Sequence, residues 1–131
     1  MSQIVWFLDF QGTLNQIPHW QGIVRSLLEI GDRVIINTGD AEYAASLVPK
    51  DLKIVVLHKL LPDDGMEVVL QLYPDVSKVI LSDDAWQGKT LEHAQEGAQK
   101  VLGEVPCEVV DVKNLYAAIY KRLNEMHFGV G

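Results

Sequence analysis

The sequence predicts an α/β fold built on a parallel sheet, and two features of the chain lead to that prediction. Short apolar runs alternate with longer amphipathic ones along nearly the whole chain, which is typical of repeated strand–helix–strand units. The apolar runs are continuous rather than alternating, as in strands that are covered on both faces. We therefore expect a three-layer α/β/α sandwich around a five-stranded, mainly parallel sheet.

Five strands and five helices are expected in strict alternation. Each predicted strand is rich in Val and Ile, and the strands cover residues 4–8, 33–36, 53–57, 78–81 and 107–110. The first and fourth helices end at glycines, Gly31 and Gly103, and the third begins after Pro62 and ends before Pro74. The predicted helices cover residues 20–30, 41–48, 63–72, 90–102 and 112–126.

The length of 131 residues indicates one domain, 1–131. Residues 128–131 are expected to form a short flexible tail. A formal net charge of −7 argues against non-specific binding to nucleic acid or to an anionic membrane surface.

The single cysteine, Cys107, cannot form an internal disulfide, and it begins an apolar run, as a core residue would. No apolar run approaches the length of a membrane span, and a basic leader is lacking, so we expect a cytoplasmic protein.

Polar residues that carry chemistry follow the first four predicted strands. Asp9 follows the first strand, Thr38 lies just after the second, Lys59 follows the third, and the pair Asp83 and Asp84 follows the fourth. Because the carboxyl ends of parallel strands meet at one edge of a sheet, these groups should converge there. Three carboxylates form an all-oxygen site that suits Mg²⁺, and an ammonium group and a hydroxyl can bind phosphoryl oxygens.

This order of residues resembles the haloacid dehalogenase (HAD) superfamily. The first motif of that family is a hydrophobic strand followed by Asp-x-Asp-Gly-Thr, and residues 9–13 read Asp-Phe-Gln-Gly-Thr. Thr38 is similar to the Thr or Ser of the second motif, Lys59 to the third-motif Lys, and the pair Asp83 and Asp84 to the acidic fourth motif. The resemblance implies a HAD-like Rossmannoid fold and covers the chain from the first strand onward.

The resemblance also implies roles for individual residues. Asp9 would be the nucleophile and a Mg²⁺ ligand, and the backbone carbonyl of Gln11, Asp83 and Asp84 would complete the metal site. Thr38 and Lys59 would hold the transferred phosphoryl group together with the glycines that follow each motif, Gly12 and Gly39. The expected catalytic set is therefore Asp9, Gln11, Thr38 and Lys59.

Gln11 departs from the family pattern, because it stands where phosphatases have their general acid/base. An amide does not titrate near neutral pH, and losing a general acid/base typically costs about 10²–10⁴ in rate. Two functions therefore stay open: a Mg²⁺-dependent phosphohydrolase with reduced or narrow activity, and a catalytically inactive HAD-fold binding or regulatory protein. The sequence also leaves open whether another group, such as His58, replaces the missing acid.

No sizeable cap domain is expected, because the two segments in which the family inserts its caps hold little beyond one helix each. An open site suits a large, even macromolecular, phosphorylated substrate, or else a partner subunit such as a second copy of the chain must cover it.

A receiver domain is the nearest alternative fold with carboxylates, Thr and Lys. In receivers the acidic pair follows the first strand, whereas here a single Asp does, so we reject that alternative.

Overall fold

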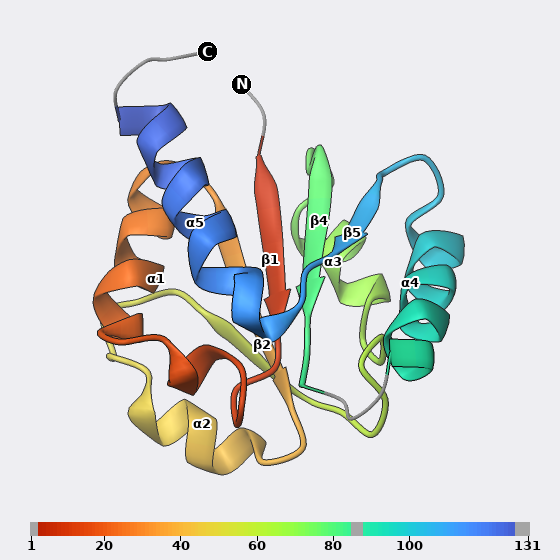
Figure 1. Ribbon diagram of the computed structural model, residues 1–131, viewed down its shortest axis with the longest axis horizontal. Coiled ribbons are helices and arrows are strands. Elements are labelled where there is room, and N and C mark those ends of the chain that lie inside the picture. Colours follow the sequence, from red (N-terminus) through yellow and green to blue (C-terminus); the bar gives the residue numbers. More distant parts are fainter. Residues whose placement is uncertain (1–2, 85–87, 128–131) are drawn as a thin grey trace.

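The computed structural model describes residues 3–84 and 88–127, with the side chains of 88–91 and 127 left aside, and the predicted tail 128–131 lies outside the described residues. Within this part of the chain, strands and helices alternate as the sequence predicts (Figure 1). The strands are β1 (Ile4–Leu8), β2 (Arg33–Thr38), β3 (Val55–His58), β4 (Lys78–Ser82) and β5 (Cys107–Val109). The helices are the 3₁₀ helix η1 (Leu14–Gln16) and the α-helices α1 (Trp20–Glu29), α2 (Ala41–Leu47), α3 (Glu67–Leu72), α4 (Gly88–Leu102) and α5 (Val112–His127).

The five strands form one sheet in the order β3-β2-β1-β4-β5, and all the strand pairs are parallel. The chain builds outward from β1 to β3 on one side and then crosses back to place β4 on the other side of β1. This reversal creates a topological switch point between β1 and β4, which is where open α/β sheets bind their ligands, at the carboxyl ends of the strands.

Two hydrophobic clusters pack against the sheet, and they use alternate residues of the central strand. Trp6 and Leu8 of β1 belong to the cluster that includes residues of α1, α2 and α5. Val5 and Phe7 belong to the cluster that includes residues of α3 and α4. Successive side chains of a strand point to opposite faces, so both faces of β1 are covered by helices. Cys107 is buried in the second cluster, as a core residue is expected to be.

Several predicted boundaries are wrong by one or more residues. The strand β2 continues through Asn37 and Thr38, so Thr38 is the last residue of the strand and not part of the loop after it. The largest error concerns α3, which begins at Glu67 rather than at residue 63. The Asp64 carboxylate instead accepts hydrogen bonds from two backbone amides of the preceding turn, and Gly65 has a positive φ of 81° that a helix cannot contain.

A buried ion pair fixes the last helix at the amino edge of the sheet. The carboxylate of Asp32, which is fully buried, accepts bonds from Arg122 Nη2 at 2.7 Å and Arg122 Nε at 2.9 Å. It also accepts a bond from Trp6 Nε1 at 3.1 Å and one from the amide of Ile4 at 3.2 Å. Four donors therefore satisfy this carboxylate and join α5 to β1 at the edge opposite the candidate site.

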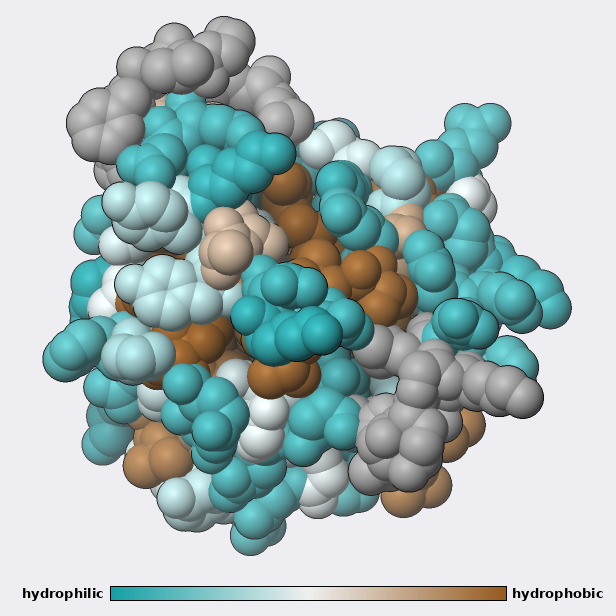
Figure 2. Space-filling model, in the orientation of Figure 1, coloured by the Kyte–Doolittle hydropathy of each residue, from teal (hydrophilic) through white to brown (hydrophobic). Residues whose placement is uncertain are grey.

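The surface near β4 and β5 is in part apolar. Figure 2 shows hydrophobic side chains that reach the surface between α5 and α4, with hydrophilic groups on both sides. A hollow of about 210 Å³ lies there, lined by residues that include Ile4, Ile80 and Val110. In the part of the chain that the structure describes, no helix combines the length and the apolar character that crossing a membrane requires.

Candidate functional site

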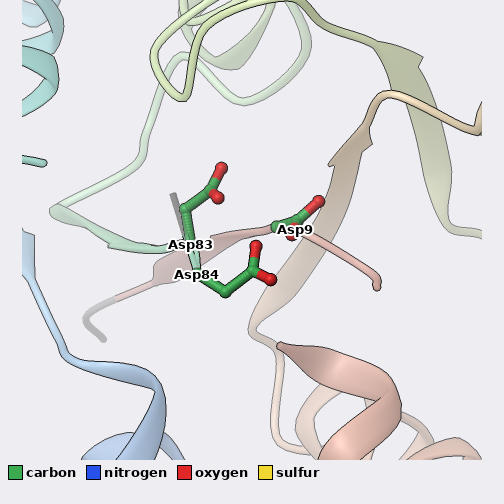
Figure 3. A group of neighbouring side chains, drawn as sticks. All are labelled: Asp9, Asp83 and Asp84. Atoms are coloured by element: carbon green, nitrogen blue, oxygen red, sulfur yellow. The ribbon is translucent and has the colours of Figure 1, made fainter. Parts of the chain in front are cut away.

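The acidic residues predicted at the strand ends lie together. The backbone amide of Asp9 donates to the Ser82 carbonyl at 3.0 Å, so the pairing of β1 with β4 continues one residue past Leu8. This pairing sets Asp9 beside Asp83 and Asp84, and Figure 3 shows the three carboxyl groups gathered at the ends of the two strands. One oxygen from each lies within 4.8 Å of the others. The site therefore lies at the switch point of the sheet.

Lys59 reaches this acidic cluster from the other side of β1. Its backbone amide donates to the Thr38 carbonyl at 3.0 Å, which extends the pairing of β2 with β3 beyond His58. The Lys59 ammonium is 3.3 Å from Asp9 Oδ1 and forms a close ion pair with Asp83 Oδ2. Its side chain is only 11% exposed. One largely buried cation thus bridges two of the three carboxylates, and the group as a whole keeps a net negative charge.

The surroundings of Asp9 favour its protonated form. Burial raises the pKa of Asp9 from its ordinary 3.8 to about 6, assisted by hydrogen bonding with Asp84 and by the charge of Asp84. Lys59 opposes the change but does not cancel it. Burial also lowers the pKa of Lys59, although the neighbouring carboxylates oppose that shift. The cluster is therefore under-neutralised, since one ammonium group cannot compensate for three carboxyl groups, two of which are almost fully buried.

The loop after β1 is shaped by a glycine. Gly12 has a φ of 76°, which residues with a side chain rarely adopt. A Cβ atom at Gly12 would stand 2.1 Å from Asp84 Oδ2, so the Asp84 carboxylate fills the space that a side chain would need. The motif glycine is thus required both by the turn and by the close approach of an acidic side chain.

Two residues of this loop have functions that the sequence analysis missed. Asn15 Oδ1 accepts from the Gly12 amide at 2.8 Å, while Asn15 Nδ2 donates to Gln11 Oε1 at 2.7 Å. Asn15 therefore fixes both the turn and the amide at the position of the missing acid. Thr13 is fully buried, and its hydroxyl lies 3.4 Å from Asp9 Oδ2, where it can donate to the carboxylate. The position of Thr13 four residues after Asp9 is a signal that could have identified Thr13, whereas the contacts of Asn15 depend on the turn and leave no such signal.

Thr38 and Gly39 lie next to Lys59, as predicted. Thr38 is 2% exposed, and its Oγ1 accepts a hydrogen bond from the Asp40 amide at 3.4 Å. A Cβ atom at Gly39 would be 3.9 Å from the Lys59 carbonyl, so these two backbone segments are in contact. His58 ends β3 and is exposed. Thr38 and Gly39 therefore lie beside the backbone of the residue whose ammonium bridges the acidic cluster.

The donor set of the cluster suits a hard cation. Asp9, Asp83 and Asp84 each offer a carboxylate oxygen, and oxygen ligands are those that Mg²⁺ and similar cations prefer. Asp9 and Asp83 are almost fully buried, whereas Asp84 is exposed and can adjust. The under-neutralised charge described above is a further reason to expect a cation. The ligand role of the Gln11 carbonyl stays a prediction.

Comparisons with known proteins add no family to this description. No family model, no curated protein and no solved structure matches the chain.

Proposed function

We propose that this protein is a Mg²⁺-dependent phosphohydrolase of the HAD type, which acts through an aspartyl-phosphate at Asp9. The observation that carries the proposal is the convergence of Asp9, Lys59, Asp83 and Asp84 at the switch point between β1 and β4. The four side chains follow three different strands, and the sequence motifs resemble the HAD pattern in the same order. The helices on both faces of β1 also support the three-layer α/β/α sandwich of such a domain, without a sizeable cap.

In the proposed reaction Asp9 attacks the phosphorus atom of a phosphate ester. Lys59 and Thr38 bind the phosphoryl oxygens, and the Thr13 hydroxyl holds Asp9 Oδ2 so that the carboxylate keeps one orientation. Asp9, Asp83 and Asp84, with the Gln11 carbonyl, would hold Mg²⁺, which supplies charge neutralisation for the incoming phosphoryl group. The new bond joins an Asp9 oxygen to phosphorus, while the bond from phosphorus to the leaving oxygen breaks with its electron pair. Water then attacks phosphorus, the bond between Asp9 and phosphorus breaks, and the proton of that water passes to solvent, which releases inorganic phosphate and restores the Asp9 carboxylate.

Gln11 restricts the substrates that such an enzyme can use. Its side chain is exposed and hydrogen-bonded to Asn15, and an amide cannot protonate the leaving oxygen. Esters whose leaving oxygen is stable as an anion lose least from this change, since they need no proton at the moment of bond cleavage. The proposed enzyme is therefore selective for acyl and aryl phosphates over alkyl phosphates.

The test is hydrolysis of acetyl phosphate and p-nitrophenyl phosphate with and without Mg²⁺. Asp9→Asn should abolish turnover, while the control variant Asp75→Asn, an exposed residue at the amino edge of the sheet, should leave it unchanged. Turnover at the same rate in wild type and Asp9→Asn would rule out the proposed intermediate. Both variants should first give the circular dichroism spectrum of the wild-type protein.

A second candidate function is a binding protein without turnover, and Gln11 is the observation that favours it. The two functions make opposite predictions for Gln11→Asp. In a competent site the restored acid should raise hydrolysis of alkyl phosphates by about 10²-fold or more. In a binding protein the same substitution should give no activity, although a phosphate mimic such as methylphosphonate should still bind at the site.

A further inference from the structure

A hollow of about 470 Å³ lies at the amino edge of the sheet, the edge opposite the acidic cluster. Arg33, the first residue of β2, and Tyr73, the residue after α3, both line it. The strand β1 runs from this edge, next to the N-terminus, to the carboxyl edge (Figure 1), so the length of a strand separates the hollow from Asp9. The volume of the hollow is in the range of small-molecule sites.

The hollow is positively charged, although the chain as a whole is acidic. Its lining contains three basic and two acidic residues, which are Arg25, Arg33, Lys53, Glu29 and Asp51. The formal net charge of the chain is −7, since 18 Asp and Glu residues outnumber 11 Lys and Arg residues. An anion can be attracted to such a chain only where cations are locally in excess, and this hollow is such a place.

The two acidic residues of the lining act on Arg25. Arg25 Nη1 donates to Asp51 Oδ2 at 2.5 Å, and Arg25 Nη2 donates to Asp51 Oδ1 at 3.3 Å. The pKa of Arg25 is raised, chiefly by its hydrogen bonding to Asp51 and in part by the charge of Glu29. The negative charges of the hollow thus lie around Arg25, and the other two basic residues supply the excess of positive charge.

Arg33 and Lys53 are these two remaining cations. Among the side chains that the structure describes, neither forms an ion pair with a carboxylate, and Arg33 Nη1 donates to the Asp32 carbonyl at 3.0 Å. The strands β2 and β3 pair with Ile35 opposite Val55. Arg33 and Lys53 each lie two residues before that pair, so two like charges begin neighbouring segments of chain. Like charges in such positions repel each other, and an anion between them would relieve the repulsion.

The rest of the lining suits the apolar part of a ligand. Leu28 and Leu52 contribute apolar surface, and Tyr73 contributes an aromatic ring. Burial raises the pKa of Tyr73, and the charge of Arg33 opposes that rise, so the guanidinium group lies within electrostatic reach of the phenol. The Tyr73 hydroxyl can therefore donate a hydrogen bond to an anion held near Arg33.

We propose that this hollow is a second ligand site, which binds a small organic dianion with an apolar body. The negative end of the ligand lies between Arg33 and Lys53, where a guanidinium group can hold an oxyanion by two parallel hydrogen bonds. The apolar body lies on Leu28 and Leu52. The acidic residues around Arg25 disfavour a further negative charge at the other end of the ligand. This inference is independent of the proposed phosphohydrolase, because it uses none of the residues of the acidic cluster.

The test follows the backbone amide signals of the protein by NMR at pH 7.5, with a chelator present, while one of three carboxylates is added. Phthalate has two adjacent carboxylates on a ring, benzoate has the ring with one carboxylate, and maleate has the paired carboxylates without the ring. Phthalate should shift the signals of Arg33, Leu52 and Lys53 and should bind roughly fivefold more tightly than benzoate or maleate. The signals of Asp9 and Lys59 should not move.

Two lysine variants test the position of the negative end. Lys53→Gln should weaken phthalate binding by about 3- to 5-fold. Lys50→Gln is the matched control, because it removes the same charge three residues away, from an exposed lysine that is not among the described residues lining the hollow. Both lysines are exposed, so both variants should fold normally.

Arg33→Gln should have a larger effect, a loss of about 10-fold in phthalate affinity, because the half-buried guanidinium group supplies hydrogen bonds as well as charge. Its circular dichroism spectrum should first match that of the wild type, since the substitution also removes the hydrogen bond to the Asp32 carbonyl.

The outcomes decide whether the hollow is a ligand site. Signal shifts at the amino edge, together with a greater loss of affinity in Lys53→Gln than in Lys50→Gln, would support the proposal. Equal losses in the two lysine variants would show that phthalate responds only to the overall charge of the protein, and would overturn it. Equal affinities for the three carboxylates, shifts centred on Asp9 and Lys59, or no shifts at about 10 mM phthalate would overturn it as well.

Discussion

Asp9→Asn should make the metal-free protein more stable at neutral pH. The pKa of Asp9 is raised in the folded state from 3.8 to about 6, because the carboxyl group is buried and lies against Asp84. At pH 7.5 the group is ionised in both the folded and the unfolded chain, and its charge is therefore held in the folded state at a cost. An asparagine has nearly the same shape without the charge, so the substitution removes that cost.

The magnitude follows from the difference between the two pKa values. The pKa of Asp9 rises from 3.8 to about 6, and each unit of pKa corresponds to about 1.4 kcal/mol. The charge of Asp9 therefore costs the folded state about 3 kcal/mol. Between these two values the folded state binds more protons than the unfolded state, so the free energy of unfolding of the wild type falls as the pH rises from about 4 to about 6. The advantage of Asp9→Asn should be greatest above pH 7 and should disappear near pH 4.

The assay is urea denaturation of the wild type and Asp9→Asn at pH 4, 5.5 and 7.5, with a chelator present. Asp75→Asn is the control, because Asp75 is exposed and distant from the cluster. Adding Mg²⁺ at pH 7.5 should stabilise the wild type and have little effect on Asp9→Asn. A variant that is less stable than the wild type at pH 7.5 in chelator, or an advantage that does not depend on pH, would refute the description of this cluster as under-neutralised.

Three further predictions concern other parts of the chain. Asp32→Asn should lower the free energy of unfolding by about 3–5 kcal/mol in urea, because it leaves the Arg122 guanidinium beside a neutral partner in a buried place. Gly12→Ala should cost about 1–2 kcal/mol for the positive φ alone and should also weaken Mg²⁺ binding in calorimetry, since the new Cβ displaces the Asp84 carboxylate. The Cys107 thiol, whose pKa burial raises to about 11, should react with a thiol reagent at pH 8 only after the protein is unfolded.

The arrangement of strands and helices could be predicted because the central strands β1, β2 and β4 are apolar on both faces and amphipathic segments lie between the strands. What the sequence could not show is where local hydrogen bonds override these patterns. Pro62 and the acidic residues after it are typical of a first helical turn, but Asp64 is used as an acceptor within its own loop, which delays α3 to Glu67. The side chain of Asn37 also donates to the Asp64 carbonyl at 2.7 Å, and this contact spans 27 residues of sequence. A contact of that kind leaves no local signal.

The candidate site was predictable to the extent that its residues follow strands. The positions of Asp9, Lys59 and Asp83 come directly from the parallel register, which brings the strand ends together. The sequence did not reveal the hydrogen bonds of Asn15, because they depend on the turn made by the loop itself.

Two buried acidic residues of this chain differ in how their charges are matched, and the difference supports the proposal of a ligand at the cluster. Asp32 and Asp9 both lie next to β1 strand ends, Asp32 at the amino edge and Asp9 at the carboxyl edge, and both are shielded from water. Asp32 has four hydrogen-bond donors, two of them from a guanidinium group, so its charge is matched by the protein itself. Asp9 shares one ammonium with Asp83 and lies against Asp84, and its pKa rises to about 6. A fold that matches one buried carboxylate and leaves another under-neutralised keeps a destabilising arrangement at its switch point, as functional sites commonly do. This contrast is the reason that we propose a cation and a phosphoryl group as the ligands of the cluster.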